Sequence, residues 1–411
     1  MKIEPRTLKG FRDFLPTDAR KRQYVINTLK SVFELYGFEP LETPSLEYAE
    51  ILTGKYGEEG DKLMYKFTDN GGREVALRYD QTVPLARAVA QNKDKLPTPF
   101  KRYQIQNVWR AENTQKGRFR EFLQCDIDTV GIDSSIADTE IITCVMKCLN
   151  ALGFTTYKIL LNDRENLKFT DGTKAFSETD NAKIVRSLDK LKKIGEEGVI
   201  KELINQGFSQ EVASSILKTI MKRNPTERLK TIIENLKKTG ISSEKYEFTP
   251  TLARGLDYYT GLIMEVEIGN YTAGSIGGGG RYDQLIGIFS EKQIPAVGFA
   301  FGFDRLLEAM ETLELFPPTL TTTKVLILNL PEIEEKALEV TYNLRAKNIN
   351  TEIYLDSNIE KVKQFQYAIK KNIPYTILIN NDGTYTLGWK ESGKIRKEIL
   401  SYDKLLVQLN K

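Results

Sequence analysis

The sequence predicts an α+β protein, and three observations carry this prediction. Two apolar-rich runs flank a polar loop within residues 99–131, which is the pattern of a β-hairpin. Short, lysine-rich amphipathic runs between residues 168 and 245 indicate a helical segment. From residue 324 onward, strand-like and helix-like runs alternate, as they do in a small α/β domain. A stretch rich in proline and threonine, residues 313–323, is typical of a linker before this last domain.

The composition limits the possible chemistry before any motif is considered. The 411 residues include no histidine and three cysteines. Imidazole general bases, Ser/His and Cys/His nucleophilic pairs and histidine-ligated metals are therefore excluded, and three cysteines are too few for a disulfide framework or a zinc site. Because no apolar run is long enough to cross a bilayer and no secretory pattern opens the chain, we expect a cytoplasmic protein without a membrane partner.

Near the N-terminus the sequence predicts a helix and then a strand with a polar face. Apolar residues recur at helical spacing over residues 17–36. Alternation over residues 75–82 predicts a strand on which Arg78, Asp80 and Thr82 share one face. A carboxylate and a hydroxyl side by side suit an ammonium group.

The predicted hairpin is unusually charged. Its loop carries five charged side chains, those of Arg110, Glu112, Lys116, Arg118 and Arg120. On the returning strand, period two places Phe122, Gln124, Asp126 and Asp128 on the face opposite Leu123, Cys125 and Ile127. Two interpretations stay open: a charged hairpin exposed to water, or a pocket that holds a polyphosphate beside a cationic small molecule.

The segments that follow are expected to be mostly helical. Residues 132–154 have Ser or Asp near their start and Gly153 at their end, which predicts a capped helix. Residues 182–240 hold 13 Lys and Arg against 7 Asp and Glu, although the whole chain carries a net charge of only +3. This basic segment is either a solvated helical hairpin or a surface that contacts phosphates without reading bases.

Two glycine-containing runs precede the linker. In residues 275–287, SIGGGGRYDQLIG, four consecutive glycines allow close approach of a ligand or a positive φ, and they match neither a Walker A loop nor a dinucleotide fingerprint. In residues 294–310, IPAVGFAFGFDRLLEAM, Gly298 and Gly302 could leave room for a flat ring before a helix bearing Arg305. An ordinary glycine-containing strand followed by an amphipathic helix fits the second run equally well.

Several of these runs resemble class II aminoacyl-tRNA synthetases, and the histidyl family in particular. The charged hairpin is similar to motif 2 through RAE at 110–112, QKGR at 115–118, REF at 120–122 and Gln124. Residues 254–261, RGLDYYTG, resemble a signature peptide found in histidyl-tRNA synthetases and not in class II enzymes generally. SIGGGGRYDQLIG resembles the second histidyl signature, FEPLETPSLE and IPAVGFAFGFDRLLEAM resemble motifs 1 and 3, and LKGFRDFLP resembles the family's usual opening.

The resemblance implies a domain organisation and a set of partners. It implies a catalytic domain with an antiparallel sheet over residues 1–318, a helical insertion at about 168–245 that approaches the tRNA acceptor arm, and an anticodon-binding domain over 324–411. Histidine and ATP would form histidyl-adenylate and pyrophosphate, and the histidyl group would pass to tRNA(His). Motif 1, which in class II enzymes ends in a proline, here Pro44, and forms much of the dimer interface, implies a homodimer.

The resemblance also implies a role for each site residue. ATP would be bound by Arg110, Glu112, Arg118, Gly302 and Arg305, with Mg²⁺ bridging its phosphates and no metal held by cysteine or histidine. Histidine would be bound by Asp80, Thr82, Gln124, Asp128, Tyr258, Tyr259 and Tyr282. Catalysis would depend on Arg254 and Arg110, which would grip the α-phosphate from two sides, so that no general base is required.

Two other classes of protein share parts of this pattern. The synthetase-like regulatory subunit of ATP phosphoribosyltransferase keeps the catalytic fold but usually lacks the signature residues and the C-terminal domain, both of which are expected here. A pseudo-synthetase module fused to a kinase is disfavoured because no kinase motif occurs in the sequence.

Overall fold

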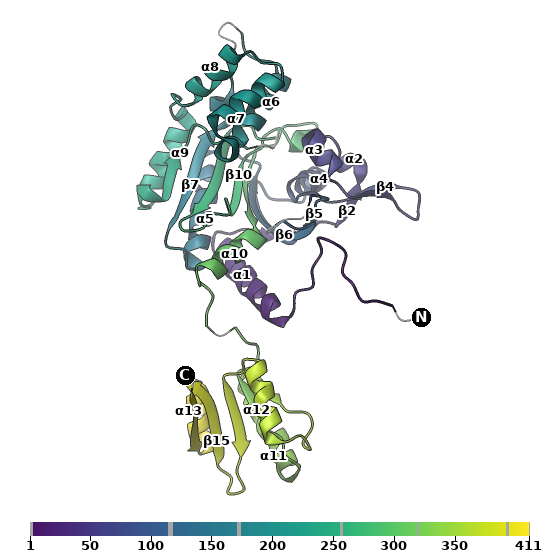
Figure 1. Cartoon of the computed structure of the whole chain (residues 1–411), viewed down its shortest axis with the longest axis vertical. Coiled ribbons are helices and arrows are strands. Elements are labelled where there is room, and N and C mark those ends of the chain that lie inside the picture. The colour runs from purple at the N-terminus through teal and green to yellow at the C-terminus, as the bar shows by residue number, and fades with distance from the viewer. Residues whose placement is uncertain are drawn as a thin grey trace. The chain divides into compact units, whose positions relative to one another are not determined.

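Two compact units make up the structure, a computed structural model that describes residues 3–113, 118–170, 174–254, 258–318, 320–391 and 394–410, without the side chains of 57–59. One unit comprises residues 1–15 and 21–316, and the other comprises residues 16–20 and 317–411. The first is built on an eight-stranded sheet and the second on a five-stranded sheet (Figure 1). With helices against both sheets, the fold class is α+β, as the sequence predicts.

The larger sheet is mostly antiparallel and has the predicted hairpin near one edge. Its strand order is β1-β5-β6-β11-β10-β9-β7-β8, and only the two edge strands pair in parallel. The strands are β1 (Glu39–Pro40), β5 (Phe100–Trp109), β6 (Glu121–Val130), β11 (Ala296–Gly302), β10 (Gly277–Arg281), β9 (Leu262–Ile268), β7 (Tyr157–Asp163) and β8 (Tyr246–Phe248). Strands β5 and β6 pair over their full length, with Phe100 opposite Val130 and Trp109 opposite Glu121.

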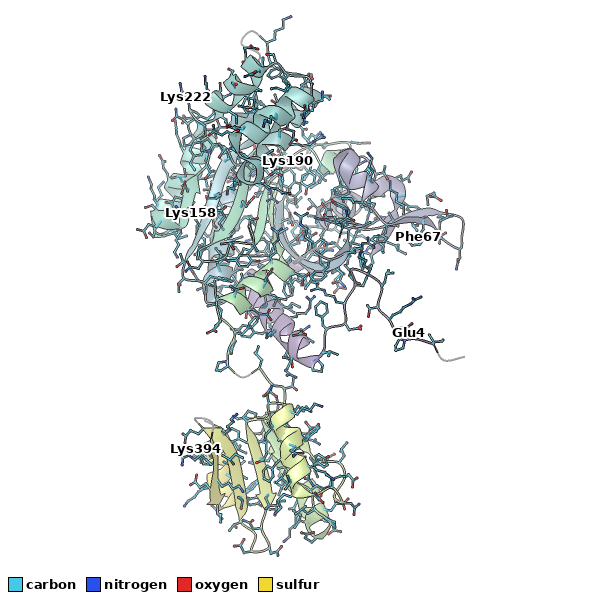
Figure 2. All side chains as sticks on the ribbon, in the orientation of Figure 1. Glu4, Phe67, Lys158, Lys190, Lys222 and Lys394 are labelled. Atoms are coloured by element: carbon cyan, nitrogen blue, oxygen red, sulfur yellow. The ribbon has the colours of Figure 1, made fainter. Side chains whose placement is uncertain are left out.

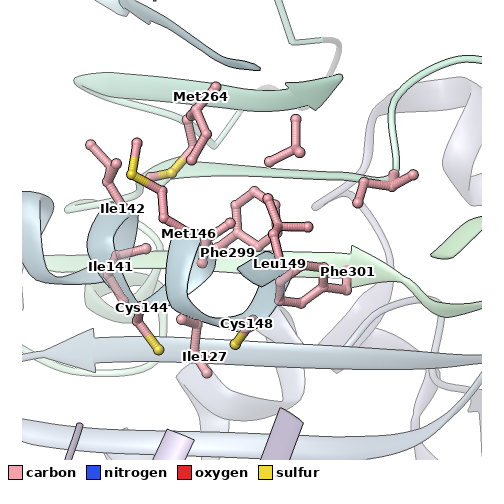
Figure 3. Packing of buried hydrophobic residues seen from close by; sticks show 14 of the residues in the cluster. Ile127, Ile141, Ile142, Cys144, Met146, Cys148, Leu149, Met264, Phe299 and Phe301 are labelled. Carbon is pink, nitrogen blue, oxygen red and sulfur yellow. The ribbon is translucent and has the colours of Figure 1, made fainter. Parts of the chain in front are cut away.

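Helices cover one face of this sheet and leave the other face polar near its centre. Helices α1 (Pro16–Leu35), α5 (Ser135–Ala151), α9 (Glu227–Lys238) and α10 (Phe303–Thr312) pack their apolar sides into one core with the sheet. In this core Cys144 and Cys148 of α5 lie near Ile127 of β6 (Figure 3). The predicted alternation along β6 is therefore confirmed, because Leu123, Cys125 and Ile127 are buried in the core while the residues between them face away.

A three-stranded sheet and short helices precede the hairpin, and here one prediction is wrong. Strands β2 (Leu46–Tyr48), β4 (Glu74–Leu77) and β3 (Lys66–Thr68) accompany α2 (Ala49–Leu52), α3 (Gly57–Lys62) and α4 (Thr82–Asn92). The strand expected to continue to Thr82 ends at Leu77. The Asp80 carboxylate accepts a hydrogen bond from the backbone N–H of Val83, and this local cap favours a helix start over a strand. Arg78 does not share a face with Asp80, since its buried guanidinium donates to the carbonyls of Thr43 and Asn107.

The basic segment is helical, with more helices than the sequence suggested. It comprises η1 (Arg164–Leu167), α6 (Glu178–Asp189), α7 (Leu191–Asn205), α8 (Gln210–Ile220), α9 and η2 (Ser243–Lys245). The lysine-rich run at residues 183–195 does not form one continuous helix, because α6 ends before Lys190 and Gly195 adopts a φ of 70° within α7. Helices α6 to α8 share their own core, and Lys190 and Lys222 are exposed on this segment (Figure 2).

The second unit alternates strands and helices as predicted. Its sheet has the order β13-β12-β14-β15-β16, parallel among the first three strands and antiparallel after them. Its elements are β12 (Val325–Ile327), η4 (Pro331–Ile333), α11 (Glu334–Ala346), β13 (Thr351–Ile353), α12 (Lys361–Lys370), β14 (Tyr375–Ile379), β15 (Tyr385–Glu391), β16 (Lys394–Leu400) and α13 (Tyr402–Leu409). The sequence analysis did not identify β16, which is charged and largely exposed and therefore lacks the apolar alternation of a half-buried strand. Within the described part of the chain, no helix has the length and apolarity needed to cross a bilayer.

Candidate active site

A cavity of about 740 Å³ opens on the polar side of the large sheet. Its lining includes all thirteen side chains or glycines that the sequence analysis singled out for ATP, histidine or catalysis: Asp80, Thr82, Arg110, Glu112, Arg118, Gln124, Asp128, Arg254, Tyr258, Tyr259, Tyr282, Gly302 and Arg305. These positions come from segments more than 200 residues apart. Gln124, Asp128 and Gly302 lie on the paired strands β6 and β11, and the others lie in loops and at helix starts.

Asp80 lies at one end of the cavity among hydroxyl groups. Tyr56 Oη donates to Asp80 Oδ1 over 2.8 Å, and Tyr258 Oη lies 3.5 Å from Oδ2. Burial raises the pKa of Asp80, while the hydrogen bonds from Tyr56 and from the Val83 backbone act in the opposite direction. Thr82 lines the cavity at the first residue of α4. This end can therefore present one carboxylate and one hydroxyl to a ligand, although from a loop and a helix start and not from one strand.

Asp128 is held by two buried side chains, one on β5 and one directly after β10. Tyr282 Oη donates to Asp128 Oδ1, and Arg102 Nη2 lies 2.7 Å from Asp128 Oδ2. Burial raises the pKa of Asp128, and the charge of Arg102 opposes that rise. Gly298 is required here, since a Cβ at this position would lie 1.9 Å from Asp128 Oδ1. The room left by Gly298 is therefore occupied by Asp128 and not by a flat ring.

Asp126 and Gln124 lie on the same face of β6 as Asp128. Gln124 Nε2 donates to Asp126 Oδ1 over 3.3 Å, and Arg110 Nη2 approaches Gln124 Oε1 at 3.4 Å. Burial raises the pKa of Asp126 to about 8, with Arg102 lowering it and Asp128 raising it. Three buried carboxyl groups, those of Asp80, Asp126 and Asp128, thus line one part of the cavity.

Two cations of the charged hairpin, Arg110 and Arg118, line the same cavity. The Arg110 Nε–H donates to the carbonyl of Tyr79 over 3.1 Å, and its guanidinium lies 4.4 Å from the centre of the Tyr79 ring. Arg118 forms a 3.2 Å ion pair with Glu112 and is half exposed, with 51% of its side chain accessible. Lys116 and the rest of QKG, residues 115–117, lie outside the described residues.

Arg254 reaches the cavity over the glycines of β10. Its Nη1 lies 3.1 Å from Glu265 Oε2 on the neighbouring strand β9, and a Cβ at Gly278 would lie 2.5 Å from Nη1. None of residues 277–280 has a positive φ. The positive-φ interpretation of the four glycines is therefore wrong, and close approach of a ligand stays a prediction; the contacts that the glycines permit here are with the protein's own side chains and backbone. Residues 255–257 of the signature peptide lie outside the described residues.

Arg305 completes the cationic part from the start of α10. It donates from Nη1 to the carbonyl of Ser275 over 3.0 Å. Its neighbour Asp304 accepts from Arg12 Nη2 over 2.9 Å, and the guanidinium of Arg12 lies 3.1 Å from the ring centre of Phe119. The N-terminal segment therefore contacts both the charged hairpin and the start of α10.

The sequence analysis missed four residues that shape this site. Tyr56, Arg102 and Glu265 were not considered, and Asp126 was placed on the polar face of its strand without a role. A signal was available for two of them, because Arg102 and Asp126 are charged residues within strands that are otherwise rich in apolar residues. Tyr56 and Glu265 contact the site through pairings that only the folded chain creates.

The cavity as a whole has a cationic part and an anionic part. Four arginines, Arg110, Arg118, Arg254 and Arg305, suit the charge and the bidentate geometry of a polyphosphate. The carboxylates and tyrosines suit a ligand that carries an ammonium group and N–H donors. A nucleotide and a small amino compound can therefore lie side by side in this cavity.

Comparison with known proteins identifies the family. The family model for histidyl-tRNA synthetase matches residues 10–306, and the model for an anticodon-binding domain matches residues 324–406. The histidine–tRNA ligase of Christiangramia forsetii is 41% identical, over 96% of this chain and 97% of its own, and that of Cytophaga hutchinsonii is 38% identical over 99% of both. The crystal structure of histidyl-tRNA synthetase from Nostoc sp. PCC 7120 has 29% identity and a TM-score of 0.85, covering 100% of this chain and 99% of that one. On these matches, the chain belongs to the histidyl-tRNA synthetase family.

Proposed function

We propose that the protein is a histidine–tRNA ligase, which condenses L-histidine with ATP and transfers the histidyl group to tRNA(His). The observation that carries this proposal is the single cavity in which an arginine-lined part adjoins a carboxylate-lined part. Its relatives of 38–41% identity bear the name histidine–tRNA ligase, and the signature residues Arg254, Tyr258 and Tyr259 line the cavity.

The arginines are proposed to bind the ATP phosphates. Arg110 and Arg254 would contact the α-phosphate, and Arg118 and Arg305 would hold the β- and γ-phosphates. Glu112 would lie near the adenine, beside Gly302. The chemical step is an in-line attack of the histidine carboxylate on the α-phosphate, in which positioning and charge stabilisation dominate. This chemistry needs no imidazole from the protein, which has none.

The carboxylates and tyrosines are proposed to bind histidine. Asp80, Thr82 and Gln124 would receive its ammonium group, with Tyr258 beside them. Asp128 and Tyr259 would contact the two ring nitrogens, and Tyr282 would hold Asp128. Burial raises the pKa of Tyr259, with the charge of Arg254 lowering it and that of Asp128 raising it, so its hydroxyl keeps its proton at neutral pH and can donate.

Mg²⁺ is proposed to arrive with ATP, as the MgATP substrate. Among the residues with described side chains, no three carboxylate or cysteine groups converge in the manner of a metal site. The residues at the phosphate end are arginines together with Glu112, which fit a metal held mainly by phosphate oxygens. When bound, Mg²⁺ would neutralise part of the phosphate charge.

The remaining assignments are proposed from the same family resemblance. Residues 1–318 would form the catalytic domain, the basic segment at about 168–245 its helical insertion towards the acceptor arm, and residues 324–411 the anticodon-binding domain. We further propose a homodimer, formed in part by the segment around Pro44, and a cytoplasmic location.

Histidine-dependent exchange between pyrophosphate and ATP tests the proposal. The purified chain should catalyse this exchange with histidine and not with the other amino acids, and it should charge tRNA(His). A regulatory subunit of ATP phosphoribosyltransferase would bind histidine without exchange. The matched C-terminal domain supports the ligase over that alternative.

A further inference from the structure

Arg102 is a fully buried cation that contacts Asp128, the carboxylate proposed to bind the histidine ring. None of its side chain is exposed, and it is not among the residues that line the cavity. Its Nη2 forms a 2.7 Å ion pair with Asp128 Oδ2, and none of its three guanidinium nitrogens has a hydrogen-bond partner among the described residues. A buried charge is tolerated only where an opposite charge compensates it, so Arg102 and Asp128 depend on each other.

The pairing of β5 with β6 places Arg102 where it acts on two carboxyl groups. Arg102 is directly opposite Asp128, and Gln104 is directly opposite Asp126, in the antiparallel ladder. Residues directly opposite each other share a face of the sheet, and so do residues two apart on one strand. Arg102 therefore faces both Asp126 and Asp128, and its charge lowers the pKa of each against the effect of burial.

Asp126 also contacts Gln124, a residue that lines the cavity. Its Oδ1 accepts from Gln124 Nε2 over 3.3 Å. This contact orients the Gln124 amide so that Oε1 lies on the other side, within 3.4 Å of Arg110. An amide held in this way presents its oxygen, an acceptor, to a donor in the cavity.

We propose that Arg102 and Asp126 are positioning residues for amino-acid recognition, Arg102 by holding Asp128 and Asp126 by orienting the amide of Gln124. The inference rests on the proposed function, because it assumes that the ligand beside Asp128 and Gln124 is histidine. Neither residue needs to touch the substrate. Together they fix two hydrogen-bond acceptors in the pocket. The Asp128 carboxylate is oriented towards a ring N–H of histidine, and the Gln124 amide oxygen is oriented towards its ammonium group.

The consequence is a selective effect on histidine. Without Arg102, Asp128 is buried without its cation, and it either takes up a proton or turns away. Protonation replaces the charged acceptor for the ring N–H with a weaker neutral one, and turning away removes the acceptor. The arginines that line the phosphate end are held by other groups, such as the carbonyls of Tyr79 and Ser275, so ATP binding should change little.

The first experiment compares Arg102→Met with Lys101→Met by histidine-dependent pyrophosphate exchange. Lys101 is the adjacent cation on β5, and it pairs with Glu140 over 2.9 Å, outside the cavity. We expect Arg102→Met to raise the KM for histidine about 10- to 100-fold and the KM for ATP less than about threefold. Lys101→Met should change neither, and Arg102→Lys should recover part of the histidine affinity. Equal rises in both KM values, or no rise for histidine, would overturn the role of Arg102.

A second pair of variants tests the role of Asp126, whether or not Arg102→Met folds. Asp126→Asn keeps an oxygen that accepts from Gln124, whereas Asp126→Ala removes it. At pH 7 we expect the KM for histidine to stay near the wild-type value in Asp126→Asn and to rise about tenfold in Asp126→Ala. Equal KM values in the two variants would overturn the role of Asp126. If the wild-type chain itself shows no histidine-dependent exchange, the proposed function fails, which is a different result from an active wild type with insensitive variants.

Discussion

Arg254 can line the cavity, where it is proposed to bind phosphate, because Gly278 has no side chain. The Glu265 carboxylate, 3.1 Å from Arg254 Nη1, holds the guanidinium from the next strand. A guanidinium fixed in this way stabilises charge that develops on the α-phosphate oxygens during the attack. It would therefore contribute more to the transition state than to ATP binding.

We expect Arg254→Ala to lower kcat for histidine activation by about 10²- to 10³-fold, which corresponds to about 3–4 kcal/mol. The KM for ATP should change only a few-fold, since other arginines still bind the phosphates. Steady-state pyrophosphate exchange measures both constants. Near-normal exchange by this variant would contradict the assignment of Arg254 to the α-phosphate.

Asp126 gives a prediction about stability and pH. Its pKa is raised to about 8 in the folded chain by burial, whereas an aspartate in an unfolded chain has a pKa of about 3.9. Between these values the folded state binds a proton that the unfolded state does not bind. Raising the pH from 5 to 8 should therefore lower the free energy of unfolding, by at most about 1.4 kcal/mol per pH unit for this group.

The variant Asp126→Asn cannot ionise and should lose this part of the pH dependence. Relative to wild type, it should gain stability as the pH rises from 5 to 8 and gain nothing further well above pH 8. Denaturant unfolding of both proteins at several pH values measures the difference. Parallel curves for the two proteins would show that Asp126 is already ionised at pH 5.

At the scale of elements, the N-terminal segment connects the charged hairpin to the start of α10, which both carry proposed phosphate-binding residues. The carbonyl of Gly10 accepts from the Arg120 N–H over 2.9 Å. Arg12 lies between the Phe119 ring and the Asp304 carboxylate. These contacts fix the distance between the charged hairpin and the start of α10.

We expect Arg12→Ala to loosen this spacing and to raise the KM for ATP about three- to tenfold, with a smaller effect on the KM for histidine. Arg6, which is exposed on the same segment, provides the matched control Arg6→Ala. Pyrophosphate exchange measures the KM for ATP and the KM for histidine in both variants. An unchanged KM for ATP in Arg12→Ala would show that the hairpin is positioned without the N-terminal segment.

At the scale of the whole molecule, the proposed site residues and the C-terminal sheet belong to different units. The thirteen predicted site residues lie in the unit formed by residues 1–15 and 21–316. The second unit has its own core. We therefore expect truncation after Thr323 to leave histidine-dependent exchange measurable while kcat/KM for charging tRNA(His) falls at least about 100-fold, or about 3 kcal/mol.

Aminoacylation and exchange, measured on the same truncated preparation, test this separation. Exchange reports whether the catalytic unit is folded, so that a loss of charging can be attributed to tRNA binding. Unchanged charging would show that the C-terminal domain is not the part that binds the tRNA.

Local patterns in the sequence predicted much of the fold and of the site. The alternation along β6, the capped helix α5 and the alternating strands and helices of the C-terminal domain are confirmed because periodicity, caps and turn residues act over a few residues. The thirteen site residues could be singled out because their motifs are continuous stretches, and the structure brings them to one cavity.

Only the tertiary structure decided how these stretches meet. The contact of Arg102 with Asp128 depends on the register of β5 and β6, and the space for Asp128 depends on Gly298 in a strand that lies far along the sequence. Asp80 lies just before helix α4 and not in a strand, because its carboxylate accepts a hydrogen bond from the backbone N–H of Val83. The period-two alternation from which the strand was predicted contains no information about this hydrogen bond. The sequence by itself therefore determined the family, the kinds of elements and the chemical groups of the site. The burial and pairing of these groups were decided by tertiary structure, because charge compensation between buried residues depends on distances in space and not on separation along the chain.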